Sequence, residues 1–141
     1  MAGLSEAQVQ EALATYIRIK YPRVIFHSDF GSGAKLTVGQ ARKQKRQNAG
    51  MRGFPDLQIC HPIDRWNGFF LEIKKEGVCV VLKNGKLTSR EHIREQASMI
   101  EKLRSVGYWA DFGIGYEDCR QKVDAYMRGR ANAKTWTRWD S

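Results

Sequence analysis

Two short segments near the middle of the chain determine its interpretation: Gly53-Phe54-Pro55-Asp56-Leu57 and Phe69-Phe70-Leu71-Glu72-Ile73-Lys74. The second segment is apolar enough to form a buried strand. Side chains alternate across a strand, which rises about 3.3 Å per residue, so Glu72 and Lys74 share one face with Cα atoms about 6–7 Å apart. The alternate residues of this strand then point the other way, into a core.

The first segment places a second acid beside that strand. Pro55 disfavours helix for the residue before it, so Asp56 is expected to open another strand at residues 57–60. Two carboxylates on adjacent strands, Asp56 and Glu72, can hold one hard divalent cation through oxygen. Lys74 is then close enough to orient or deprotonate an attacking water and to balance charge on a phosphate. The alternative is a solvated ion pair of Glu72 and Lys74, but an acid in an apolar strand is costly unless something neutralises it.

The two segments resemble the motif of the VRR-NUC domain, a branch of the PD-(D/E)xK nuclease superfamily found alone in phage proteins and in the eukaryotic Fanconi-associated nuclease. Further matching residues are Lys86-Leu87-Thr88, Gln96 and Leu103 through Gly107-Tyr108. The resemblance covers most of residues 4 to about 120 and leaves the C-terminal tail outside. It implies an α/β fold with a restriction-endonuclease-like core, a central mixed β-sheet flanked by helices. It also implies dependence on Mg²⁺ or Mn²⁺ and hydrolysis of DNA phosphodiester bonds, with a 3′ oxygen as the leaving group.

A helix at residues 5–20 is expected to bring a third acid to the site. Ser5 is its predicted N-cap, with Gln8 at the capping-box position. Glu6 lies within the apolar stripe of this helix, whereas Glu11 lies on its solvent side. Related nucleases often place an acid here, so we expect Glu6 to reach the site. The alternative is that Glu6 only favours the positive end of the helix dipole.

A second helix is expected to contribute a glutamine. It follows a predicted hairpin at Val78–Leu82 with a turn at Asn84-Gly85, and Thr88 is its predicted N-cap. Gln96 lies in the middle of the apolar face of this helix. In the family that the chain resembles, this position lies beside the active site, so we expect Gln96 to hydrogen-bond a carboxylate or a metal-bound water. The alternative is a local hydrogen bond in the core.

The predicted metal site combines these residues. The expected cation is Mg²⁺ (or Mn²⁺), held by Asp56, Glu72 and the backbone carbonyl of Ile73, with Glu6 acting through water. Magnesium keeps several waters in its coordination shell, and one of them can supply the nucleophile. The predicted catalytic residues are Asp56, Glu72, Lys74, Glu6 and Gln96.

The charge of the chain favours a polyanionic partner. The formal net charge is +9, and residues 35–52 contain six basic residues and no acid. We call these six residues the basic loop: Lys35, Arg42, Lys43, Lys45, Arg46 and Arg52. Their position just before the Pro-Asp motif predicts that they bind DNA phosphates. The alternative is a solvated charged loop.

The length of 141 residues fits one domain, which we place at residues 1–127, with a basic and aromatic tail at 128–141. Trp136 and Trp139 in this tail are expected either to pack on the protein or to stack on bases. The chain has no apolar run of about 20 residues and no signal-peptide pattern. Its three cysteines suit reduced thiols. We therefore expect no membrane partner and a cytoplasmic location, in a bacterial host cell if the chain is phage-encoded.

The substrate and the oligomeric state stay open in the sequence. One domain of this size reaches one scissile bond, so cutting both strands of branched DNA or of a Holliday junction requires a homodimer. The predicted hairpin and the tail are candidate dimer surfaces. Two other functions are compatible with the pattern: a non-catalytic DNA-binding module on a nuclease fold, and a ribonuclease or RNA-binding protein.

Overall fold

A computed structural model of the chain describes residues 3–29, 39, 43, 52–131 and 136–140. In this part of the chain a four-stranded sheet has the order β1 (Phe26–Ser28), β2 (Leu57–Ile59), β3 (Phe69–Lys74) and β4 (Trp109–Ile114). The first three strands pair antiparallel, and β4 joins β3 in parallel. The predicted α/β fold with a mixed sheet is therefore confirmed.

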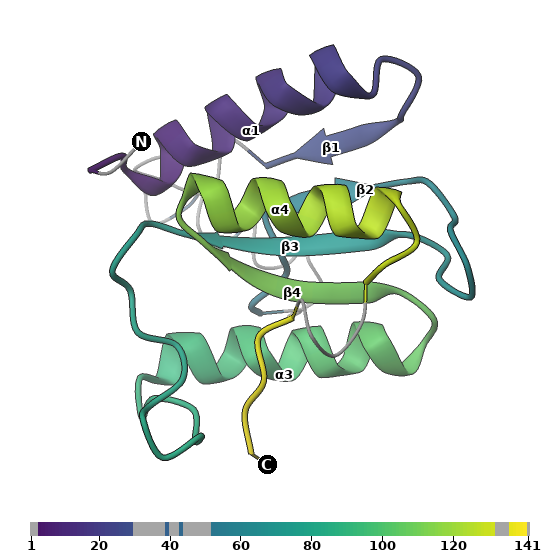
Figure 1. Ribbon diagram of the computed structural model, residues 1–141. Coiled ribbons are helices and arrows are strands. Elements are labelled where there is room, and N and C mark those ends of the chain that lie inside the picture. The colour runs from purple at the N-terminus through teal and green to yellow at the C-terminus, as the bar shows by residue number, and fades with distance from the viewer. Residues whose placement is uncertain (1–2, 30–38, 40–42, 44–51, 132–135, 141) are drawn as a thin grey trace.

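Helices cover both faces of this sheet (Figure 1). α1 (Glu6–Lys20) and α4 (Tyr116–Met127) lie over one face, and α3 (Glu91–Ser105) lies under the other. α1 begins with the predicted capping box, in which the Gln8 N–H donates to Ser5 Oγ at 3.2 Å and the Ser5 N–H donates to Gln8 Oε1 at 2.9 Å. None of the described helices is long and apolar enough to cross a membrane.

The strand β3 lies in the interior of the sheet, and all six of its residues are buried. Phe69, Leu71 and Ile73 belong to the core beneath α1 and α4, whereas Phe70 belongs to the core above α3. Since side chains alternate along a strand, Glu72 and Lys74 share the face of Phe70. Two charged residues are therefore buried in an apolar strand, with exposed fractions of 4% for Glu72 and 5% for Lys74.

The outer edge of β4 is closed by charged side chains. Arg104 Nε donates to the Ala110 carbonyl at 2.7 Å, and Lys122 Nζ donates to the Phe112 carbonyl at 2.6 Å. Both cations are also paired with Asp111, which is fully buried. An edge strand whose polar groups are already bonded cannot add a further strand. Among the described residues, the sheet therefore ends at β4.

The described part of the tail, residues 136–140, packs on its own domain. The Trp136 ring stacks on Trp109 with centroids 3.9 Å apart, and Trp139 Nε1 donates to Glu101 Oε1 at 2.8 Å. The Arg104 guanidinium lies over both tail tryptophans, 5.0 Å from the Trp136 ring and 5.4 Å from the Trp139 ring. This packing agrees with the first of the two roles expected for the tail.

Of two local predictions between β3 and α3, one is confirmed in a short form and one is wrong. The predicted hairpin consists of one antiparallel bridge between Val81 and Leu87, in which the Leu82 N–H donates to the Lys86 carbonyl at 2.8 Å. The prediction of Thr88 as N-cap is wrong. The Thr88 N–H donates to the Val80 carbonyl at 2.9 Å, which ties the residue to the loop. The helix begins two residues after the expected position, with Arg90 as N-cap and no side-chain cap.

Candidate active site

The pairing of β2 with β3 brings the two predicted acids together. Leu57 pairs with Leu71, so the same antiparallel register places Asp56 opposite Glu72, one step further along. β2 begins at Leu57, and beyond it the Ile73 N–H donates to Asp56 Oδ2 at 3.0 Å. The N–H and C=O of a strand residue point to the same edge, so the Ile73 carbonyl lies on the edge that Asp56 occupies.

Gly53 fixes the segment that carries Asp56. Its φ is +75°, and a Cβ atom at this position would lie 2.7 Å from the Glu95 carbonyl oxygen and 2.8 Å from the Gln96 nitrogen. Only glycine allows the backbone of this segment to approach the backbone of α3 so closely. The sequence shows Gly53 within the motif, but its contact with α3 is not predictable from local pattern. The contact links the position of Asp56 to that of Gln96.

The Glu72 carboxylate is only partly satisfied. Glu72 Oε1 accepts a hydrogen bond from Gln96 Nε2 at 2.7 Å, whereas Oε2 is buried and has no donor among the described residues. Burial, followed by the nearby Asp56 carboxylate, raises the pKa of Glu72 well above its usual value. Burial also raises the pKa of Asp56. Two acids whose ionised forms are both disfavoured are suited to a site that a cation completes.

Lys74 lies between two acids. Its Nζ is 3.8 Å from Glu72 Oε1 and 3.9 Å from Glu6 Oε1. The side chain of Glu6 is 48% exposed, so this residue is not buried in the apolar stripe where the sequence places it. It belongs to the first turn of α1, and its carboxylate nevertheless points toward Lys74. The structure thus brings Glu6 to the predicted site, together with Asp56, Glu72, Lys74 and Gln96.

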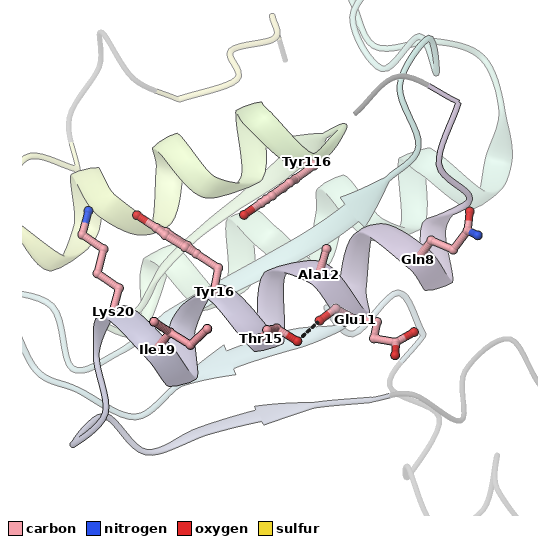
Figure 2. A pocket seen from close by; sticks show the side chains of 8 residues that line it. All are labelled: Gln8, Glu11, Ala12, Thr15, Tyr16, Ile19, Lys20 and Tyr116. Atoms are coloured by element: carbon pink, nitrogen blue, oxygen red, sulfur yellow. Dashed lines mark hydrogen bonds between the residues drawn. The ribbon is translucent and has the colours of Figure 1, made fainter.

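Glu11 lies elsewhere, as the sequence predicts. It lines a groove of about 630 Å³ along α1. Figure 2 shows the lining side chains, with Ala12, Thr15, Tyr16 and Tyr116 among them. None of the predicted catalytic residues lines this groove. Glu6 and Glu11 therefore differ in surroundings although they lie on the same helix.

The predicted metal site has few protein side chains that would bind the cation directly. Within the described ranges, no three or more His, Cys, Asp or Glu side chains gather closely enough to hold a metal ion by themselves. The predicted set uses only two side chains directly, Asp56 and Glu72, together with a carbonyl and a water-mediated Glu6. These hard oxygen donors fit Mg²⁺ or Mn²⁺, and one of them is buried with no hydrogen-bond partner among the described residues. The identity of the cation stays a prediction.

One neighbour of the site is absent from the sequence-based prediction. His92 lies one helical turn before Gln96, and its Nε2 is 3.0 Å from Gln96 Nε2. The i, i+4 spacing on a helix was the available signal, because such residues are neighbours on the helix surface.

The basic loop lies largely outside the described residues, where Lys35, Arg42, Lys45 and Arg46 all fall. Lys43 is exposed. Arg52 is also exposed and forms an ion pair with Glu95 at 3.7 Å. The predicted DNA contacts of this loop stay predictions.

Comparison with known proteins supports the fold. A solved structure of a "VRR_NUC domain protein" superimposes with a TM-score of 0.64 at 24% sequence identity, covering 94% of this chain and 99% of that chain. No protein-family model and no curated protein matches the sequence. The chain therefore shares its fold with that protein over nearly the full length of both, which agrees with the fold that the sequence motifs imply.

Proposed function

We propose that this protein is a divalent-metal-dependent endodeoxyribonuclease whose active site is formed by Asp56, Glu72 and Lys74. The observation that carries the proposal is the buried Glu72 carboxylate, which faces a second acid and keeps one oxygen without a donor in the described structure. A purely structural ion pair with Lys74 would not need a second acid beside it. The similarity to a VRR_NUC domain protein supports a nuclease.

In this proposal Asp56, Glu72 and the Ile73 carbonyl hold Mg²⁺ or Mn²⁺, with Glu6 acting through water. When bound, such a cation polarises the phosphate and lowers the pKa of a water molecule. Gln96 keeps the Glu72 carboxylate in one orientation, because its Nε2 donates to Oε1 at 2.7 Å. The other oxygen of Glu72 is then left for the cation.

Lys74 acts on the phosphate. Its Nζ lies within 4 Å of both Glu72 and Glu6, and these two acids keep the ammonium group in place. An ammonium held in a buried site can donate a hydrogen bond to an oxygen on which negative charge develops during the reaction. Lys74 Nζ can also orient the attacking water, while the bond to a 3′ oxygen breaks.

The proposed substrate is DNA, a polyanion that the basic loop would bind. Within DNA, the proposed preference is for branched molecules cut by a homodimer, because one domain reaches one scissile bond. A free edge of β4 is not available for the dimer contact, because Arg104 and Lys122 already bond its carbonyls. Cytoplasmic action, in a bacterial host cell if the chain is phage-encoded, is part of the same proposal.

The test is a cleavage assay on four labelled substrates: a four-way DNA junction, duplex DNA, single-stranded DNA and RNA. Each is incubated with Mg²⁺, with Mn²⁺ and with chelator. Glu72→Ala and Lys74→Ala should each lower the cleavage rate by at least about 100-fold, the scale of a lost electrostatic contact to the transition state. Both variants should still bind DNA. Glu6→Gln should lower the rate by at least about tenfold, and Glu11→Gln, its matched control on the same helix, should cleave normally.

The outcomes separate the alternatives. Cleavage of RNA alone would identify a ribonuclease. Binding of DNA by the wild type without cleavage under any metal condition would identify a non-catalytic binding module. Full cleavage by Glu72→Ala would exclude this site, and full cleavage by Lys74→Ala would remove the role of the lysine. A larger effect of Glu11→Gln than of Glu6→Gln would show that Glu11, and not Glu6, is the acid of α1 that belongs to the site.

A further inference from the structure

His92 is connected to the proposed metal site by two successive contacts. Its Nε2 is 3.0 Å from Gln96 Nε2, and the same amide nitrogen donates to Glu72 Oε1 at 2.7 Å. His92 lies in the first turn of α3 and is exposed, whereas Gln96 and Glu72 are buried, each with an exposed fraction of 4%. The three residues thus form a chain from solvent to the buried carboxylate.

The contacts determine which way the Gln96 amide is turned. An amide nitrogen carries two hydrogens and an amide oxygen carries none. With the nitrogen between Glu72 Oε1 and His92 Nε2, both hydrogens have acceptors, provided that His92 carries its proton on Nδ1. The reversed amide would place Gln96 Oε1 about where the nitrogen now lies, 2.7 Å from a carboxylate oxygen, and two acceptors repel each other.

Little else in the described structure holds the amide in this orientation. Gln96 Oε1 is buried and has no hydrogen-bond partner among the described residues. The side of the amide that faces away from Glu72 and His92 therefore contributes nothing to its orientation. Its two acceptors are a carboxylate that is itself a proposed metal ligand and an exposed imidazole. Of these two, the imidazole is the one that does not take part in binding the cation.

We propose that His92 is a positioning residue, which accepts a hydrogen bond from Gln96 and so keeps the amide nitrogen on Glu72 Oε1, leaving Glu72 Oε2 for the cation. The inference rests on the proposed function, because it assumes that Glu72 binds a metal ion. Without the acceptor on His92, the amide loses one of its two partners and turns more freely. The affinity for the cation should then fall by about tenfold or more, the usual effect of removing a partner that orients a metal ligand.

Two substitutions separate the hydrogen bond from the packing of the ring. In His92→Gln the end of the side chain occupies about the position of the imidazole Nε2, so an acceptor oxygen remains within reach of Gln96. In His92→Asn the shorter amide reaches only the position of Nδ1. Since His92 is exposed, neither change removes a core residue. His61→Asn is a matched control, because His61 follows the opposite end of β2 from Asp56. Its backbone carbonyl accepts from the Tyr126 hydroxyl at 2.6 Å, a bond that does not depend on the side chain of His61.

The test measures Mn²⁺ binding to the full chain without DNA, by calorimetry or electron paramagnetic resonance. His92→Asn should weaken Mn²⁺ binding by about tenfold or more, while His92→Gln and His61→Asn should bind as the wild type does. In cleavage assays, the rate of His92→Asn should be far below that of the wild type at limiting Mn²⁺ and much closer to it at saturating Mn²⁺. The KM for DNA should not change. A general loss of structure would not be corrected by metal in this way.

Glu72→Gln separates a failure of the metal site from a failure of the role of His92. If the wild type binds Mn²⁺ and Glu72→Gln does not, the metal site stands. Equal Mn²⁺ affinity of His92→Asn and the wild type would then overturn the role of His92 alone, as would equally weak binding by His92→Gln and His92→Asn. If the wild type binds Mn²⁺ no better than Glu72→Gln, the metal site of the proposed function fails, and the role of His92 fails with it.

Discussion

Replacing Gly53 by alanine tests whether the contact between the Asp56 segment and α3 holds the site together. At φ +75° a side chain on an L residue costs about 1–2 kcal/mol. The added Cβ would also lie 2.7 Å from the Glu95 carbonyl oxygen, so backbone must move, at a typical cost of about 1–3 kcal/mol. Gly53→Ala should therefore lower the free energy of unfolding by about 2–5 kcal/mol and the Tm by roughly 5–20 °C.

The same change should affect the site more than it affects the fold. Moving the segment away from α3 changes the position of Asp56 relative to Glu72, so Mn²⁺ affinity and cleavage should both fall at temperatures where the variant is fully folded. Denaturant titration and Mn²⁺ calorimetry measure the two effects separately.

Gly129→Ala is a matched control for the backbone term. Gly129 also has a positive φ, +69°, but the nearest atom to its added Cβ is Ile63 Cγ2 at 3.9 Å, an ordinary contact. This variant should lose only about 1–2 kcal/mol of stability and should bind Mn²⁺ normally. If Gly53→Ala behaves like Gly129→Ala in both measurements, the contact with α3 does not position Asp56.

Three further predictions concern the buried Glu72, the tail and the basic loop. In chelator, the free energy of unfolding of the wild type should fall as pH rises from about 4.3, the usual pKa of Glu, toward the raised pKa of Glu72. The reason is that Glu72 keeps its proton in the folded state at a pH where the unfolded state has released it. Glu72→Gln should flatten this pH dependence in denaturant titrations. Trp136→Ala should cost about 1–3 kcal/mol through lost stacking and burial but leave DNA binding unchanged, whereas weaker binding in a filter assay would favour base stacking. Replacing Arg42, Lys43, Lys45 and Arg46 by serine should flatten the slope of log K against log salt by about one unit for each lost phosphate contact, with kcat unchanged; an unchanged slope would make the loop a solvated surface.

Local pattern was sufficient to predict the elements that carry the site. The alternation along Phe69–Lys74 places Glu72 and Lys74 on one face, and the capping box at Ser5 sets the start of α1. Pro55 marks the start of β2. These signals depend on residues close in sequence, which is why they are readable without a structure.

The parts that were missed depend on contacts between distant residues. Thr88 has the composition of an N-cap, but its hydrogen bond to Val80 removes it from the helix. The closeness of Gly53 to α3 joins residues more than 40 positions apart. His92 reaches Glu72 only through Gln96, from another element of the fold. These contacts are set by tertiary packing, and local sequence propensity does not predict them.

The central claim is that Asp56 and Glu72 together hold the divalent cation of a phosphodiesterase site. Its most direct test is a crystal of the full chain grown with Mn²⁺, with diffraction data collected at the manganese absorption edge. An anomalous peak within coordination distance of Asp56 and of Glu72 Oε2, which is absent from crystals of Glu72→Gln, is the predicted result. A peak held by other residues, or the same peak in Glu72→Gln, would contradict the account.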